Sequence, residues 1–165
     1  MADSVSELIA ALRSKQEVMA EMLSVLDLEQ ESIVALDLAT LDSHSERKRQ
    51  LLIQLETVTN RCRQLMRAVA AEQGVPGVDS LSQLIVRLLP PDREAVQGLQ
   101  SRLLEGAAAM NRVLAFNREL LQASLRTVNR SLDFFNRGFS DSCTYGDAGR
   151  MVQGGQGVRL FCKEI

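Results

Sequence analysis

The stretch from Asp92 to Arg137 contains no proline and repeats apolar residues at helical spacing along its whole length. An α-helix rises 1.5 Å per residue, so this stretch predicts a helix about 70 Å long. A chain of 165 residues can cover such a helix only if its other helices are also long. The steps of three and four residues place one set of side chains along a single seam of the helix: Leu99, Leu103, Ala107, Met110, Leu114, Asn117, Leu121, Leu125, Val128, Leu132 and Phe135.

Two further helical repeats precede this segment. Residues 5–36 carry an apolar seam that only Lys15 and Glu29 interrupt, and residues 41–69 carry a second one. Both seams have the three-and-four spacing of helices that pack on other helices. Three long helices are therefore expected.

The connections between these helices have recognisable signals. Asp37 or Ser43 is suited to cap the second helix. The sequence GVPGVDS, residues 74–80, breaks the pattern because Gly and Pro interrupt helices. A short helix is expected after Ser80, and Pro90 with Pro91 is expected to end it.

The composition agrees with an all-α fold. Aromatic residues make up 4% of the chain and Trp is absent, so the core must be built from aliphatic side chains. We expect an antiparallel bundle of three long helices plus one short helix over residues 1–138. Residues 139–165 hold five of the ten glycines and no sustained periodicity, which predicts a flexible Gly-rich tail.

The charges point to contacts between helices. The net charge is −2, but residues 1–36 carry an acidic excess while residues 37–73 and 91–137 are slightly basic. This division indicates charge complementarity within the protein and not a nucleic-acid surface, which needs a clustered basic surplus. No apolar run is long enough for stable membrane insertion, and the N-terminal sequence lacks the pattern of a secretory signal. We expect a cytoplasmic protein.

The sequence offers no recognisable catalytic or cofactor-binding pattern. His44 is the only histidine, and no nucleophile or orienting partner stands near it in a known arrangement. Cys62, Cys143 and Cys162 lack the paired spacing of a zinc site. An enzyme, a metal site and a cofactor are therefore not expected.

The end of the long helix is more apolar than one seam requires. Residues 120–139 contain Leu120, Leu121, Leu125, Val128, Leu132, Phe134, Phe135 and Phe139. Such a surface must be buried against a partner helix, another copy of the chain or the protein's own core. The sequence alone leaves these three alternatives open.

Two motifs near this region resemble those of the FlgN-type flagellar export chaperones. The first is an Asn followed by a Leu pair, here Asn117, Leu120 and Leu121, and the second is Tyr-Gly-x-x-Gly, here at residues 145–149. The order of parts, with two long helices, a short segment, a long helix and a tail, is also similar. The likeness is close over residues 117–149 and loose over the rest of the chain.

This resemblance implies a chaperone of the flagellar type III secretion system that binds the helical terminal segments of hook-associated proteins and delivers them to the export gate. It implies a cargo-binding face and a segment that docks on the cytoplasmic domain of the gate. The cargo-binding candidates are Asn117, Leu121, Leu125, Val128, Leu132 and Phe135, and the docking candidates are Tyr145, Gly146 and Gly149. The alternative is a structural coiled-coil or scaffold protein that self-associates through the same helix seams.

Overall fold

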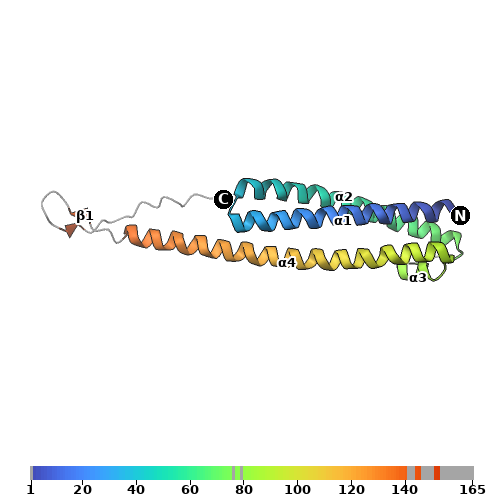
Figure 1. Ribbon diagram of the computed structural model, residues 1–165. Helices are drawn as coiled ribbons and strands as arrows, with labels where there is room; N and C mark the ends of the chain where they lie inside the picture. The colour runs from blue at the N-terminus through green and yellow to red at the C-terminus, as the bar shows by residue number, and fades with distance from the viewer. Residues whose placement is uncertain (1, 76, 79, 141–143, 146–150, 153–165) are drawn as a thin grey trace. The chain divides into compact units, whose positions relative to one another are not determined.

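The computed structural model describes residues 2–75, 77–78, 80–140, 144–145 and 151–152. Its elements, in chain order (Figure 1), are α1 (Ala2–Ala35), α2 (Leu38–Glu72), α3 (Leu81–Ile85), α4 (Pro90–Ser140), β1 (Thr144–Tyr145) and β2 (Met151–Val152). The predicted all-α class, with three long helices and one short helix, is confirmed.

The predicted tail of residues 139–165 lies mostly outside the described residues. Where the chain is described there, α4 continues to Ser140, and strands β1 and β2 pair antiparallel. The pairing was not expected from the sequence, because two residues are too few to show an alternation of apolar and polar side chains. The proposed boundary at residue 138 stays a prediction.

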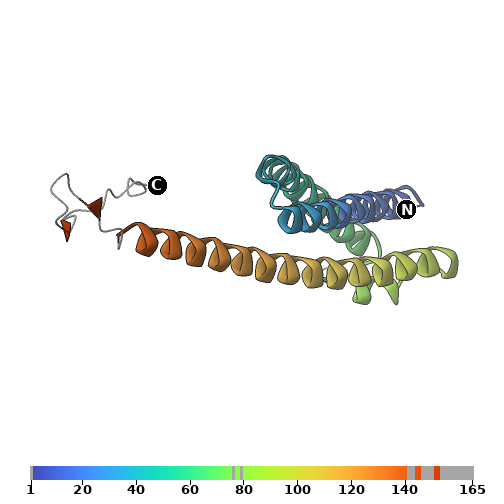
Figure 2. The ribbon, with the colours of Figure 1, turned by 60° about the vertical axis from the view of Figure 1, so that its left-hand side comes forward.

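The chain forms two compact units, residues 1–120 and residues 121–165, and α4 contributes to both. In the first unit, α1 and α2 run antiparallel and lie side by side in both views (Figures 1 and 2). Helix α4 runs in the same direction as α1, so the three long helices alternate in direction along the chain as predicted.

A tight turn joins α1 to α2. Leu36 has a φ of 55°, in the left-handed region, and Asp37 follows as the N-cap of α2. The Asp37 carboxylate accepts hydrogen bonds from the backbone N–H of Thr40, at 3.1 Å, and from the Thr40 hydroxyl, at 2.5 Å. These bonds lower the pKa of Asp37. Of the two capping candidates, Asp37 is therefore the cap, and Ser43 lies inside α2.

The prolines at the other connection act differently from the sequence prediction. Helix α3 already ends at Ile85, and Pro90 and Pro91 are the first residues of α4. Proline is favoured in a first helical turn because its missing N–H has no helical acceptor there. Ser80 caps α3 as predicted, and its hydroxyl accepts a hydrogen bond from the N–H of Gln83.

Two clusters of apolar side chains hold the first unit together. The larger one joins α1, α2, α3 and the start of α4 and includes Leu8, Leu12, Leu65, Val69, Leu84, Val96 and Leu99. The smaller one joins α1, α2 and α4 and includes Met19, Met22, Leu26, Leu51 and Met110. Most of the predicted seam of α1 is buried in these clusters, although Leu36, its last predicted member, is exposed in the turn.

Ion pairs join the acidic helix α1 to α2, as the charge distribution predicted. They link Arg47 to Glu21, Lys48 to Glu29, and Arg61 to Glu7. The two exposed pairs, at Arg47 and Arg61, are each worth less than about 1 kcal/mol.

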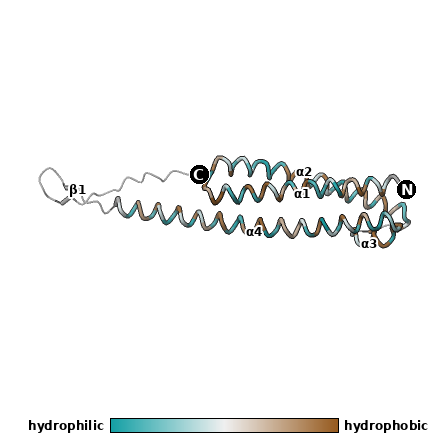
Figure 3. Tube along the Cα trace, viewed as in Figure 1, coloured by the Kyte–Doolittle hydropathy of each residue, from teal (hydrophilic) through white to brown (hydrophobic). Residues whose placement is uncertain are grey.

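Hydrophobic and hydrophilic residues are interleaved along all three long helices (Figure 3). Within the described part of the chain, no helix combines the length and apolar character that a membrane span requires.

Candidate functional site

The apolar seam of α4 changes from buried to exposed along the helix. In the first unit Leu99 is 6% exposed and Met110 is 9% exposed. In the second unit Leu125 is 61% exposed and Phe135 is 57% exposed, and Val128 and Leu132 are also exposed, while Leu121 is half-buried. We call the side formed by Leu121, Leu125, Val128, Leu132 and Phe135 the open face. The same repeat that fills a core in one unit therefore presents a hydrophobic surface in the other.

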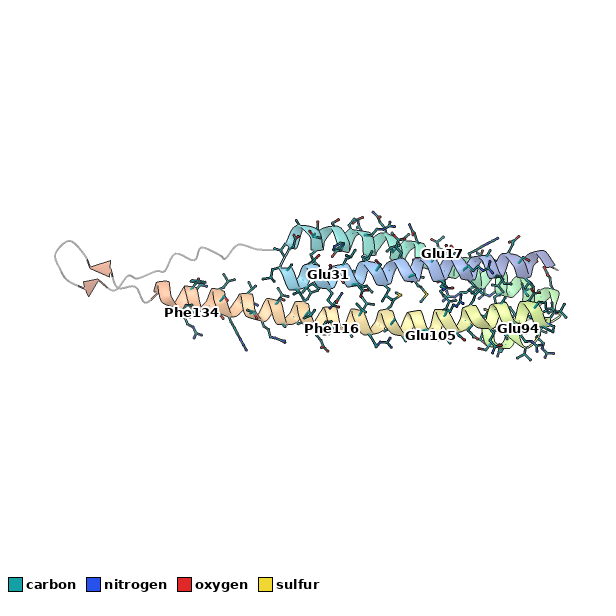
Figure 4. All side chains as sticks on the ribbon, in the orientation of Figure 1. Glu17, Glu31, Glu94, Glu105, Phe116 and Phe134 are labelled. Carbon is teal, nitrogen blue, oxygen red and sulfur yellow. The ribbon has the colours of Figure 1, made fainter. Side chains whose placement is uncertain are left out.

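The two phenylalanines widen this surface. The rings of Phe134 and Phe135 pack edge to face, with centroids 5.9 Å apart and an interplanar angle of 72°. Phe134 is 75% exposed, lies near the end of α4 (Figure 4) and meets the open face through its contact with Phe135. The extra apolar residues that the sequence showed in residues 120–139 thus form surface and not core where their side chains are described.

The hydroxyl groups next to the open face are turned into the helix. Thr127 donates its hydroxyl to the carbonyl of Ala123 at 3.1 Å, and Ser131 donates to the carbonyl of Thr127 at 3.0 Å. A hydroxyl that bonds its own helix presents mainly carbon to its surroundings. These residues therefore extend the apolar surface beside Phe134 and Phe135.

Asn117, the sixth cargo-binding candidate, lies in the first unit and is buried, with 2% of its surface exposed. Its side-chain Nδ2 donates to the carbonyl of Leu26 at 2.8 Å and to a carboxylate oxygen of Glu29 at 3.1 Å. Its Oδ1 is buried without a hydrogen-bond partner. The structure therefore places Asn117 in a link between α4 and α1, apart from the open face.

Glu29 is the residue of this link that the sequence analysis missed. It is 3% exposed and also accepts a hydrogen bond from the ammonium group of Lys48. A buried carboxylate needs such partners because its transfer from water is costly. The available signal was its position, because Glu29 is a charged residue inside an apolar seam.

Tyr145, the main docking candidate, belongs to β1, and its backbone is paired with that of Met151 in β2. Gly146 and Gly149 lie outside the described residues. The structure thus brings together five of the cargo-binding candidates and describes one of the three docking candidates.

Among the described residues, no three His, Cys, Asp or Glu side chains are grouped so that they could hold a metal ion. His44 lies half-buried in the first turns of α2, near the Asp37 cap.

Comparison with known proteins gives one match. A protein-family model described as FlgN protein matches residues 1–153. No curated protein and no solved structure matches the chain.

Proposed function

The chain belongs to the FlgN family of flagellar export chaperones, and we propose that it holds the helical terminal segments of hook-associated proteins on the open face and delivers them to the export gate. Proteins of this family are cytoplasmic, non-enzymatic chaperones that bind flagellar hook-associated proteins. The proposal adds which surface of this chain makes the contact and which segment reaches the gate.

The observation that carries the proposal is the exposure of one continuous apolar seam. Leu125, Val128, Leu132 and Phe135 follow one another at steps of three and four residues, and all four are exposed. A partner helix with its own apolar seam fits such a row, because residues at this spacing face the same side. Full burial of a Leu or Phe side chain is worth about 1.5–3 kcal/mol, so four such residues can support a specific complex.

Part of this gain is lost again when a disordered cargo segment folds. The ordering of a segment on binding costs several kcal/mol, roughly 2–5 or more. The resulting affinity is moderate, which suits a chaperone that must release its cargo for export.

Asn117 has a different role in this proposal. Its bonds to Leu26 and Glu29 fix α4 to α1 one turn before Leu121, where the open face begins. We assign it to cargo binding through this position and not through contact.

The experiment that tests the open face is a titration of the chaperone with the terminal segment of a hook-associated protein. Leu125→Asp and Phe135→Asp each place a charge within the proposed contact and are expected to weaken binding by at least about tenfold. Arg126→Asp, on the other side of α4, is the matched control and should have a much smaller effect. Unchanged binding in the first two variants, with helicity retained, would refute the assignment.

Tyr145 is proposed as the contact with the cytoplasmic domain of the export gate, together with Gly146 and Gly149. A tyrosine ring buries a large rigid surface and keeps a hydroxyl for a hydrogen bond, which makes it a favoured contact residue. Tyr145→Ala should weaken docking on the gate and leave cargo affinity unchanged. Equal loss of both activities, or loss of neither, would count against this role.

A further inference from the structure

The first unit contains an apolar groove that the open face does not use. It encloses a volume of about 370 Å³ between α1, α2, α3 and α4. We call it the bundle groove. Apolar side chains make up most of its lining: Leu8, Leu12, Met19, Cys62, Met66, Leu81, Leu103, Leu104 and Ala107. None of these residues belongs to the open face.

The lining follows the spacing of helices. The residues from α1 are Leu8, Leu12, Lys15 and Met19. The residues from α2 are Thr59, Cys62, Arg63 and Met66. The residues from α4 are Gln100, Leu103, Leu104 and Ala107. From Leu8 to Met19 the row on α1 spans eleven residue steps, which is a length of about 16 Å along the helix axis. The groove is open to solvent, since Arg63 is exposed and Leu104 is 66% exposed. The groove is about as long as three turns of a helix, and its volume of about 370 Å³ takes side chains from one face of such a helix and not its backbone.

Two cations line this groove and have no carboxylate partner among the described residues. Lys15 forms no ion pair there, and Arg63 donates only to the side-chain oxygen of Asn60, at 3.3 Å. Arg47 and Arg61, also on α2, are both paired with acids of α1. Lys15 thus interrupts the apolar seam of α1 with a charge that no acid in the described part of the chain pairs.

Lys15 shares the lining of the groove with a buried thiol, that of Cys62. Cys62 is 8% exposed, and this burial raises the pKa of its thiol. The positive charge of Lys15 opposes the rise.

We propose that the bundle groove is a second binding site for the exported partner, which inserts the apolar side of a short helix and pairs an acidic residue with Lys15 and Arg63. The proposal rests on the proposed chaperone function and adds the charge that the partner must carry. An ammonium and a guanidinium group beside one apolar groove favour a carboxylate over a neutral side chain.

A second copy of the chain is a poorer occupant because its charge has the wrong sign. The open face is an exposed apolar helix that another copy could offer. The segment of α4 that carries this face, residues 121–137, has three arginines, Arg126, Arg130 and Arg137, against one acid, Asp133. Docking of this segment would bring a net positive charge toward Lys15 and Arg63.

The test is a calorimetric titration of the full chain with the terminal segment of a hook-associated protein, at low and high salt. Lys15→Gln with Arg63→Gln should weaken binding about three- to tenfold at low salt, and the difference should shrink at high salt as the charges are screened. Arg13→Gln with Arg67→Gln is the matched control, because it removes the same charge from the same two helices outside the groove lining. The control should change affinity less than twofold.

A second pair of variants tests the apolar part of the groove. Ala107→Phe places a ring in the groove and should weaken binding by at least about tenfold, while Ala108→Phe on the exposed side of α4 should not. Circular dichroism verifies that both variants keep their helices.

The outcomes separate this inference from the proposed function. Suppose that the wild type binds the segment and that Leu125→Asp weakens this binding. If Lys15→Gln with Arg63→Gln and Ala107→Phe then leave the affinity unchanged, the groove proposal fails and the proposed function stands. If the wild type does not bind, the proposed function itself fails. If Ala107→Phe changes only self-association in sedimentation, the occupant is a second copy and the proposal is overturned.

Discussion

Replacing Asn117 by alanine should destabilise the first unit by about 2 kcal/mol. The variant loses a hydrogen bond to the buried carboxylate of Glu29, worth about 1.5–3 kcal/mol, and one to the carbonyl of Leu26, worth about 1 kcal/mol. It also removes the Asn117 Oδ1 atom, which is buried without a hydrogen-bond partner. Because the cost of burying that atom is then absent, the protein regains about 1–2 kcal/mol of stability. Glu29 keeps only Lys48 as a partner in the variant.

Urea unfolding followed by far-ultraviolet circular dichroism measures this loss. Asn111→Ala is the matched control, because Asn111 lies exposed on the same helix and the same substitution gives the same gain in helix propensity. The difference in unfolding free energy between the two variants therefore isolates the buried link. A difference below about 0.5 kcal/mol would rule out the stabilising link, because it would mean that the bonds of Asn117 contribute no more to stability than an exposed asparagine does.

Three further predictions concern local backbone geometry. Leu36→Gly should stabilise the protein by about 0.5–1 kcal/mol in thermal unfolding, because glycine adopts the left-handed φ of this turn without strain. The control Val34→Gly, inside α1, should destabilise the protein. Gly98→Ala should raise the unfolding free energy by about 1 kcal/mol, since an added Cβ meets no atom within 4 Å, and a loss of stability would contradict this. Asp37→Ala should destabilise the protein at neutral pH by removing the cap bonds from Thr40. The pKa of Asp37 is lowered in the folded state. The difference in stability between wild type and variant should therefore be present above pH 3.8, the ordinary pKa, and vanish as the pH falls through the lower pKa of the folded state. A stability difference that does not depend on pH would contradict the role of the carboxylate.

Periodicity was sufficient to predict the helices, because each seam has to face a core. The long helix was expected from Asp92 and runs from Pro90 to Ser140, without a break at Gly98 or Gly106. A glycine costs helix stability but does not remove a backbone hydrogen bond, so a long amphipathic helix can include it. The prolines were misplaced in the prediction because the same Pro-Pro sequence can end one helix or begin the next.

The candidate site was harder to predict because a seam does not reveal what covers it. Leu99 and Leu125 occupy equivalent positions of one repeat, yet one is buried and the other is exposed. The extra apolar residues Phe134 and Phe135 were the signal that distinguished the second half of the helix. The seam interruptions were equally informative, since Glu29 is a buried link to α4 and Lys15 lines the bundle groove.

If the exported segment is held on the open face of α4, its binding must protect the backbone of that part of the helix. Hydrogen–deuterium exchange of the full chain, with and without the terminal segment of a hook-associated protein, measures this protection. The amides of residues 121–138 should exchange more slowly when the segment binds, because the exposed helix becomes packed against a partner. Binding that leaves the exchange of residues 121–138 unchanged would rule out the open face as the site of the cargo.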